Sequence, residues 1–459
     1  MFANPKEVRL VKQHNAIELW GGVECTVNRV GDRFFDQVEL SGHGDRLDDL
    51  DILAELGVRA VRYPILWERT VRAGLDDFDF SWADARMKRL RELGIRVIAG
   101  LVHHGSGPHG TSLLQENFVQ GLGKFAAAIA ARYPWIEDYT PVNEPLTTAR
   151  FSALYGHWYP HRRQASAFVR ALLIQTRATR AAMTAIRAIT PSARLLQTED
   201  FGSIFGTPAL EYQVSFENQR KWLSLDLLFG RVRRTHPLYR YLLGEGASAR
   251  ELDDLATRPC RPDCVGVNYY VTSDRFLDDR IAHYPQALWG SNGRHRYVDV
   301  EAVRAHPAGI VGHREVLLSC WARYGAPLAI TEVHLGCTPD EQIRWLHEAW
   351  KGAHAARDEG ANVGAVTVWS LFGSYDWDSL VTKSRGHYEP GVFDVSAGTP
   401  RRTPLTNFVE RLARPEVLRD PSLQGWGWWR ATERFFPHAH PLAESLRQSQ
   451  FVASLPEPA

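Results

Sequence analysis

Cysteine is scarce in this sequence of 459 residues, which contains only five, spread along the chain. An odd number of scattered cysteines does not build a disulfide framework, and a reducing compartment is the default for such a chain. Cys260 and Cys264 are close in sequence, but no second cysteine or histidine pair lies near them to complete a zinc site. The sequence therefore predicts no metal site and favours a cytoplasmic protein.

A surplus of charge is missing as well. Lysine and arginine number 54 against 53 aspartate and glutamate residues, for a net charge of +1. Binding of nucleic acid or anionic lipid requires a basic excess, so we expect neither partner. No run approaches the roughly 18 consecutive apolar residues of a membrane span. The opening segment MFANPKEVRLVKQHN also lacks the apolar core of a secretory signal.

Aromatic residues, in contrast, are plentiful. They make up 11% of the chain and include 15 tryptophans. Flat apolar rings serve sugar-binding clefts, but they also fill large cores, and composition alone favours the core. The segment from Pro415 onward is rich in proline and tryptophan, with Trp426, Trp428 and Trp429. These rings are candidates for binding carbohydrate or a partner, although packing against the rest of the protein is the favoured interpretation.

Short β-rich runs alternate with long helical patterns along the chain, which is typical of parallel βα units. The expected strands are Ile17–Gly22, Val58–Pro64, Ile95–His104, Glu137–Pro145, Ala193–Asp200, Cys264–Tyr270, Pro327–Glu332 and Gly364–Ser370. The expected helices are Arg46–Leu56, Ser81–Leu93, Leu114–Arg132, Gln164–Ile189, Phe216–Gly230, Arg314–Tyr324, Pro339–Glu359 and Leu405–Leu412. Ser81 is predicted to cap its helix and Gly94 to end it. The polar, Gly/Pro-marked stretch Thr272–Gly312 is predicted to be an inserted loop.

About eight βα units close a (β/α)8 TIM barrel, so we predict an α/β barrel with long βα loops. The competing architecture is a doubly wound open sheet, which carries an early Gly-rich phosphate turn. Here the first strand ends in Trp20-Gly21-Gly22 without the G-x-G-x-x-G spacing, which favours the barrel. We expect residues 1–413 to form one barrel domain. Residues 414–459 are expected to form a C-terminal extension on or near it.

Barrel function gathers at the carboxyl ends of the strands, so the residues leaving each strand matter most. These residues are Arg62, Tyr63, His103, His104, Asn143, Glu144, Asn268, Tyr269, Tyr270, Glu332, Trp369, Asp376 and Trp377. Two carboxylates, Glu144 and Glu332, leave the fourth and seventh strands on opposite sides of one mouth. Two carboxyl groups that face each other across a bound sugar are the requirement for glycoside cleavage.

Each of these residues also has a purely structural interpretation. Glu144 alone suits a helix N-terminus, Glu332 alone suits an ion pair at the barrel end, and Arg62 alone suits neutralisation of a buried carboxylate. Adjacent strand residues point in opposite directions, so at most one of His103 and His104 is expected to face the centre. The joint occurrence of these residues at successive strand ends favours a functional site.

The same segments resemble glycoside hydrolase family 1, the retaining β-glycosidases, from Leu19-Trp20-Gly21 to about Asp394. TPVNEP is similar to the family's T-x-N-E-P signature, and AITEVH is similar to its I-T-E-N-G segment. LVHHGSGP, VRYPILW, VGVNYYVT and VWSLFGSYDW resemble further family segments. The resemblance implies that Glu144 is the acid/base and Glu332 the nucleophile. It also implies roles around them for Arg62, Asn143, Tyr270, His104, Asn268, Trp369, Asp376 and Trp377.

Expected contacts follow from those roles. Arg62 and the Tyr270 hydroxyl would favour the charged form of the nucleophile, and Asn143 would bind the sugar's 2-hydroxyl. Trp369 would offer a flat floor to the sugar ring, while His104 and Trp377 would bind its hydroxyls. No organic cofactor is implied, because the chemistry needs only carboxylates and water.

Departures from the family pattern lie among the residues that would line the sugar-binding pocket, called here the wall. Asn28 stands where the family has a longer glutamine, with Glu24 as an alternative contact, and Asp376 replaces a glutamate. Gly105 replaces a tryptophan, and Val333-His334 replace Asn-Gly. Further candidates for the altered wall, each weighed against surface ion pairing, are His43, Asp45, Arg46, Glu199 and Asp200. The identity of the sugar therefore stays open.

The leading prediction is a retaining β-glycosidase that hydrolyses a small soluble glycoside by double displacement through a covalent intermediate. A transglycosylase would use the same intermediate and pass the sugar to an acceptor. A catalytically silent carbohydrate-binding barrel is the alternative from a different class, and it has no need of a carboxylate at each face. The aglycone and the oligomeric state are not indicated by the sequence.

Overall fold

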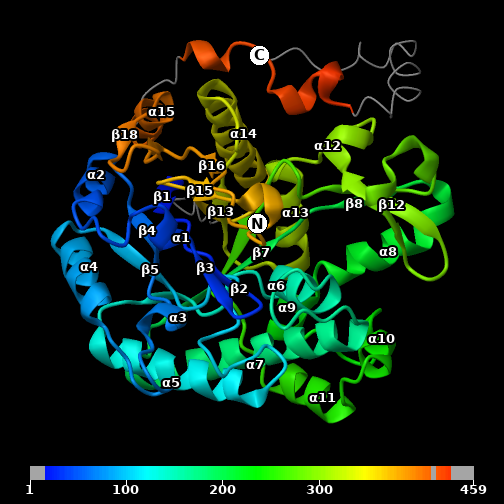
Figure 1. Cartoon of the computed structure of the whole chain (residues 1–459), viewed down its shortest axis with the longest axis horizontal. Helices are drawn as coiled ribbons and strands as arrows, with labels where there is room; N and C mark the ends of the chain where they lie inside the picture. The colour runs from blue at the N-terminus through cyan, green and yellow to red at the C-terminus, as the bar shows by residue number, and fades with distance from the viewer. Residues whose placement is uncertain (1–15, 415–419, 436–459) are drawn as a thin grey trace, which may run out of the picture.

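The computed structural model describes residues 16–414 and 420–435. Eight parallel strands close into a barrel in the order β1-β14-β13-β9-β7-β6-β5-β4, with helices around it (Figure 1). The strands are β1 (Glu18–Gly22), β4 (Ala60–Pro64), β5 (Arg96–Gly100), β6 (Asp138–Thr140), β7 (Arg194–Asp200), β9 (Cys264–Asn268), β13 (Leu328–Val333) and β14 (Val363–Val368). The predicted (β/α)8 barrel is confirmed.

The barrel strands are buried on both faces, which explains their near-continuous apolar sequence. All six residues of β13 are buried, as are the last four of β1. Alternate strand residues fill the barrel interior with one layer of side chains, as the fold requires. That layer consists of Trp20, Ala60, Ile98, Leu196, Ala329 and Ala365. The filled interior leaves the carboxyl ends of the strands as the place for chemistry.

Helices cover the outside of the barrel. The main ones are α2 (Asp49–Glu55), α4 (Ser81–Glu92), α5 (Glu116–Arg132), α7 (Ala165–Ile189), α13 (His313–Tyr324), α14 (Pro339–Asp358) and α15 (Pro404–Leu412). The predicted helix over Arg46–Leu56 begins later than expected, at Asp49. The predicted cap at Ser81 is wrong: Phe80 holds the N-cap position and Ser81 is the first helical residue. The Asp79 carboxylate accepts the Ser81 N–H instead.

One predicted helix is two helices. The stretch expected to be continuous divides into α8 (Glu211–Arg220) and α9 (Leu223–Leu228), with a turn at Lys221 and Trp222. The remaining short helices are α1 (Gln37–Leu40), α3 (Trp67–Thr70), α6 (Pro145–Ala149), α10 (Tyr239–Gly244), α11 (Ala249–Thr257) and α12 (Ala302–Ala305). Of these, α6 matters most for the site because it follows Glu144 directly.

The stretch Thr272–Gly312, predicted to be a loop, contains a small sheet and α12. Its strands β10 (Arg275–Asp278), β11 (Trp289–Ser291) and β12 (Arg296–Glu301) join β8 (Ile204–Gly206) in the order β11-β12-β10-β8. Phe276, Val298 and Val300 pack into a core of their own. The partner strand β8 lies about seventy positions earlier in the chain, which local patterning cannot reveal. In Figure 1 this sheet stands to one side of the barrel.

Short hairpins and the C-terminal segment complete the described structure. The hairpin strands are β2 (Val27–Val30) with β3 (Arg33–Asp36), β15 (Ser374–Tyr375) with β16 (Tyr388–Glu389), and β17 (Phe393–Asp394) with β18 (Arg401–Arg402). Trp429 packs edge-on against Trp345 of α14 at a ring distance of 5.0 Å, and its indole N–H donates to Glu348. Trp426 is exposed. The rest of the predicted extension lies outside the described residues.

In the portion of the chain that the structure describes, no helix is both long enough and apolar enough to cross a membrane.

Candidate active site

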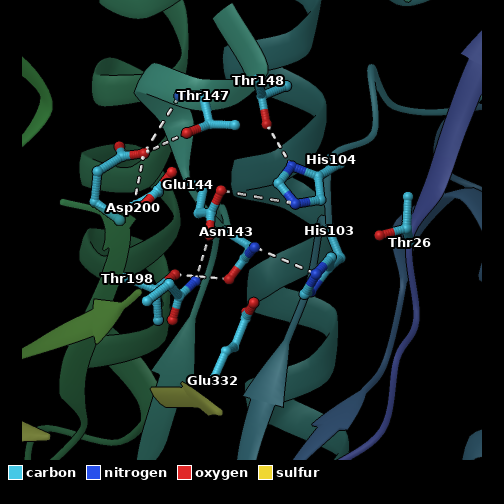
Figure 2. Close-up of polar contacts among 12 residues, drawn as sticks. Thr26, His103, His104, Asn143, Glu144, Thr147, Thr148, Thr198, Asp200 and Glu332 are labelled. Carbon is cyan, nitrogen blue, oxygen red and sulfur yellow. Dashed lines mark hydrogen bonds and ion pairs between the residues drawn. The ribbon is translucent and has the colours of Figure 1, made fainter. Parts of the chain in front are cut away.

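Two carboxyl groups lie at the mouth of the barrel. Glu144 follows β6 and precedes α6, whereas Glu332 belongs to β13. Figure 2 shows both side chains in one cluster, with Asn143 between them in this view. Glu144 is 4% exposed and Glu332 is 2% exposed. The structure therefore brings to one buried place the two acids that the sequence placed on opposite sides of a mouth.

Two donors hold the carboxylate of Glu332. The Arg62 guanidinium, from β4, donates to Glu332 Oε1 at 2.8 Å and to the Thr331 carbonyl at 2.8 Å. The Tyr270 hydroxyl donates to Glu332 Oε2. Each oxygen of Glu332 thus has one fixed donor, which orients the carboxylate from both sides.

Glu144 has a different environment. Asn268 of β9 donates to Glu144 Oε1 at 2.5 Å, and His104 Nε2 lies 3.9 Å from Glu144 Oε2. Burial raises the pKa of Glu144 well above its usual range, and the negative charges of Glu332 and Asp200 raise it further. The carboxyl of Glu144 therefore keeps its proton at a pH where an exposed glutamate has lost it.

Both histidines after β5 take part in the site, so the expectation that only one faces the centre is wrong. His103 Nε2 pairs with the Asn143 amide at 3.2 Å, and His104 Nδ1 pairs with the Thr148 hydroxyl at 3.0 Å. The backbone at His104 is left-handed, with φ of 57°, so strand alternation does not apply there. Burial, followed by the charge of Arg62, lowers the pKa of His104 to about 3, which keeps its ring neutral.

Asn143 lies at the centre of a hydrogen-bond network. Its Oδ1 accepts from Arg62 at 2.7 Å and from the Thr198 hydroxyl of β7 at 2.7 Å. Its amide nitrogen faces His103. Thr198 was missed by sequence reasoning, although its inward position on β7 was a usable signal, because it is two residues from Asp200. The network ties β4, β5 and β7 to the residue next to Glu144.

Trp369 and Glu24 pack as a pair at the floor of the site. The Trp369 indole N–H donates to Glu24 at 3.0 Å, and the ring stacks on His103 with an interplanar angle of 10°. The Arg62 guanidinium lies 4.8 Å from the centre of the same ring. The structure turns the Glu24 carboxyl toward the site, in line with its expected place as an alternative contact to Asn28. Burial raises the pKa of Glu24.

Asn28 and Asp376 have their polar groups engaged by the loop after β14. The Asn28 amide donates to the Val381 carbonyl at 3.0 Å. Both Asp376 oxygens accept from the Arg385 N–H at 3.1 Å, and one accepts from the His387 N–H at 2.9 Å. Asp376 therefore shapes its own loop, and the structure does not bring its carboxylate into contact with the Glu144–Glu332 cluster.

Trp377, on the same loop, stands edge-on to His104 at a ring distance of 5.7 Å. Trp158 contacts both rings and donates its indole N–H to the Leu380 carbonyl at 2.7 Å. Neither Trp158 nor the backbone carbonyls of the loop were foreseen from the sequence. A local sequence pattern does not indicate which backbone carbonyl will accept a hydrogen bond from a distant side chain.

The further wall candidates divide into structural residues and neighbours of the site. His43 bonds Asp49 and Tyr63 and is fully buried away from the two acids, and Arg46 bonds Asp49. Within the described residues, the Asp45 side chain makes no hydrogen bond or ion pair with Glu144 or Glu332. Glu199 and Asp200 instead lie beside Glu144, as Figure 2 shows for Asp200. Burial raises the pKa of Glu199 to about 7.

The Glu68 carboxyl explains why position 105 holds a glycine. A β-carbon at this position would lie 1.9 Å from Glu68 Oε1, so a larger residue here would require the Glu68 carboxyl to move. Glu68 Oε1 accepts the Gly107 N–H at 2.9 Å, and Oε2 is buried without a hydrogen-bond partner. The glutamate of α3 thus fills space next to the strand end where the family resemblance implied a tryptophan.

Within the described residues, no group of three histidine, cysteine, aspartate or glutamate side chains is arranged to hold a metal ion. All five cysteines are free.

Comparisons with known proteins find similarity to β-glucosidases. No family model matches the chain. A curated rice protein (Oryza sativa subsp. japonica), Beta-glucosidase 4, is 23% identical over 420 residues, which cover 80% of this chain and 84% of the rice protein.

Solved structures agree in fold. The family 1 β-glucosidase from Thermotoga maritima superposes with a TM-score of 0.65 at 17% identity, covering 86% of this chain and 97% of that chain. The β-glucosidase of the same organism in complex with deoxynojirimycin gives the same TM-score of 0.65, identity of 17% and coverage of 86% and 97%.

Fold and site together define a (β/α)8 barrel with two buried carboxyl groups at its mouth. Within that class, the chain is similar in sequence to a rice β-glucosidase and in fold to a family 1 β-glucosidase.

Proposed function

We propose that this protein, whose relatives are glycoside hydrolases, is a retaining β-glycosidase acting on a small soluble glycoside. The observation that carries the proposal is the unequal environment of the two acids. Glu332 is held by two donors, Arg62 and Tyr270, as an attacking carboxylate requires. Glu144 has a raised pKa and keeps its proton, as a general acid requires.

The first step would form a covalent intermediate. Glu332 attacks the anomeric carbon while Glu144 donates its proton to the leaving oxygen, so the glycosidic bond breaks as the glycosyl–carboxylate bond forms. The charge of Glu332 is consumed in this step. The pKa of Glu144 then falls, because one of the charges that raised it is gone.

The second step would reverse the roles. Glu144, now a carboxylate, removes a proton from water, and the resulting hydroxide displaces Glu332 from the sugar. Asn143, fixed by Arg62 and Thr198, lies beside both acids and is the candidate for binding the sugar's 2-hydroxyl. The neutral ring of His104 and the indole of Trp377 are candidates for its other hydroxyls.

The test is hydrolysis of a panel of nitrophenyl glycosides that differ in the sugar. The wild type should cleave at least one β-glycoside with retention of configuration. Glu332→Gln should lose at least about 10³-fold in kcat on that substrate, because the nucleophile is removed. A 2-fluoro glycoside with a good leaving group should label Glu332, as peptide mass spectrometry would show.

A rate that both Glu332→Gln and Glu144→Gln leave unchanged would contradict the enzyme proposal. Binding of the sugars without any turnover by the wild type would favour the silent carbohydrate-binding barrel. Transfer of the sugar to an added alcohol faster than to water would favour a transglycosylase. Labelling of a residue other than Glu332 would contradict the assigned roles.

A further inference from the structure

The acid/base candidate stands next to a helix end that would attract it. Glu144 holds the N-cap position of α6, with a left-handed backbone at φ of 43°. Pro145, the first helical residue, has no N–H, so the free donors belong to Leu146 and Thr147. A carboxylate beside such donors is drawn to them by hydrogen bonding and by the helix dipole. Yet the Glu144 side chain makes no capping bond and faces Asn268 instead.

A second glutamate takes the donors that Glu144 leaves. Glu199 Oε2 accepts the Leu146 N–H at 2.8 Å, and Oε1 accepts the Thr147 N–H at 3.3 Å and the Thr147 hydroxyl at 3.2 Å. These are the two N–H groups that an N-cap side chain ordinarily satisfies. The cap of α6 is therefore supplied by a residue of another element, β7.

The pleat of β7 explains why Glu199 reaches the helix. Successive strand residues point to opposite faces, and Thr198 faces inward to Asn143. Asp200 is in register with Asn268 of β9 and therefore shares the inward face. Glu199, between them, points outward to α6 and is completely buried there.

We propose that Glu199 is the positioning residue of the acid/base: by capping α6, it keeps the carboxyl of Glu144 free to face the substrate. This inference rests on the proposed function. It assigns Glu199 to the helix outside the mouth, which is a different role from the sugar-reading wall that the sequence suggested. Without the Glu199 carboxylate, the N–H groups of Leu146 and Thr147 would compete with Asn268 for Glu144.

The test measures how strongly each variant depends on the leaving group. A 2,4-dinitrophenyl glycoside loses its phenol without acid help, whereas a phenyl glycoside of the same sugar needs the proton of Glu144. Glu199→Gln, which keeps the volume, should lose about 10- to 100-fold in kcat/KM on the phenyl substrate. On the dinitrophenyl substrate its kcat/KM should fall less than about 3-fold. Azide, which attacks the intermediate without a base, should raise kcat of the variant on the dinitrophenyl substrate.

Two further variants make the result specific. Asp49→Asn removes a buried carboxylate whose partners are His43 and Arg46, so any loss there should be equal for both substrates. In a Glu144→Ala background, Glu199→Gln should cause no further loss on the phenyl substrate, because it acts through Glu144.

Equal losses of Glu199→Gln on both substrates, or a further loss in the Glu144→Ala background, would overturn this inference alone. A wild type that cleaves neither substrate, for any sugar of the panel, would overturn the proposed function and this inference with it. Circular dichroism and thermal melting of each variant check that the barrel is folded, and Glu199→Ala serves as the stronger truncation.

Discussion

Three residues of the site hold a backbone conformation that L-amino acids seldom adopt. His104, Glu144 and Asp376 have φ of 57°, 43° and 58°. Each such residue costs on the order of 1–3 kcal/mol and persists only where the surroundings over-determine it. Here the surroundings are identifiable: Thr148 fixes His104, Asn268 fixes Glu144, and the backbone of the loop fixes Asp376. The concentration of strain at the barrel mouth fits a site shaped for chemistry.

Glu68 supplies a prediction about stability and pH. Burial raises its pKa from 4.5 to about 8. Between pH 4.5 and about 8, Glu68 is ionised in the unfolded chain but protonated in the folded protein. The free energy of unfolding therefore falls as the pH rises through this range, and the fall is complete above about pH 8. Glu68→Gln cannot ionise. At pH 9 the variant should be more stable than the wild type by about 1–3 kcal/mol in urea unfolding.

At pH 4 the two proteins should differ little, because Glu68 is protonated in both the folded and the unfolded wild type. Glu39→Gln is the matched control, since Glu39 is exposed, and it should show no such dependence. An advantage of Glu68→Gln that is the same at pH 4 and pH 9 would contradict the assignment.

Among the elements around the barrel mouth, the loop of residues 376–387 contacts distant side chains through its backbone carbonyls. Its carbonyls at Leu380 and Val381 accept from Trp158 and Asn28, two side chains that come from distant parts of the chain. Both carbonyl residues have positive φ, 52° and 49°, and Val381 is fully buried. Asp376 holds this loop in one shape by accepting the N–H groups of Arg385 and His387.

Asp376→Ala should loosen this loop. The change removes the acceptor for the N–H groups of Arg385 and His387 and should cost about 1–3 kcal/mol of stability. We expect trypsin to cut after Lys383 several times faster and KM for the preferred glycoside to rise about 10-fold, as the wall loses its shape. Limited proteolysis and steady-state kinetics measure the two effects.

Asp378→Ala is the control on the same loop. Asp378 is exposed and pairs with Arg385 at the surface, a contact worth less than about 1 kcal/mol. Equal proteolysis of both variants would mean that the Asp376 carboxylate does not hold the loop.

Most helices and strands were predictable, because the spacing of apolar residues and the positions of turn residues are local signals. The eight barrel strands and the long helices were found, since buried parallel strands give near-continuous apolar runs. The sheet within Thr272–Gly312 was missed because its pairing with β8 is non-local. The split between α8 and α9 was missed because the break at Lys221 and Trp222 carries neither glycine nor proline.

For the molecule as a whole, the C-terminal segment is joined to the barrel through α14. Trp429 is 1% exposed, and it lies between Trp345 and Glu348. Arg430 adds an ion pair to Glu348 at 2.7 Å. The described part of this segment therefore covers α14 on the outside of the barrel.

Trp429→Ala should destabilise the protein by about 3–5 kcal/mol, as truncation of a buried tryptophan does. Thermal or urea unfolding measures the loss. Trp426→Ala is the matched control, because Trp426 is 66% exposed, and it should stay within about 0.5 kcal/mol of the wild type. Equal stability of the Trp429 variant and the wild type would show that the segment does not stabilise the barrel.

The amino-acid sequence was enough to predict the barrel and to single out Glu144, Glu332, Arg62, Asn143 and Tyr270, because parallel strands deliver their last residues to one edge. It also predicted an altered set of sugar contacts, since Asn28, Gly105 and Asp376 depart from the pattern of the family that the chain resembles. The directions in which those side chains turn became known from the folded structure alone.

Asp376 turns to its own loop, His103 joins His104 in the site, and Glu199 reaches a helix rather than a sugar. These outcomes depend on backbone carbonyls, N–H groups and left-handed residues, whose positions are set by contacts between segments far apart in the chain. Local sequence patterns carry the period of a strand or helix, but they carry no record of which distant donor will meet which acceptor.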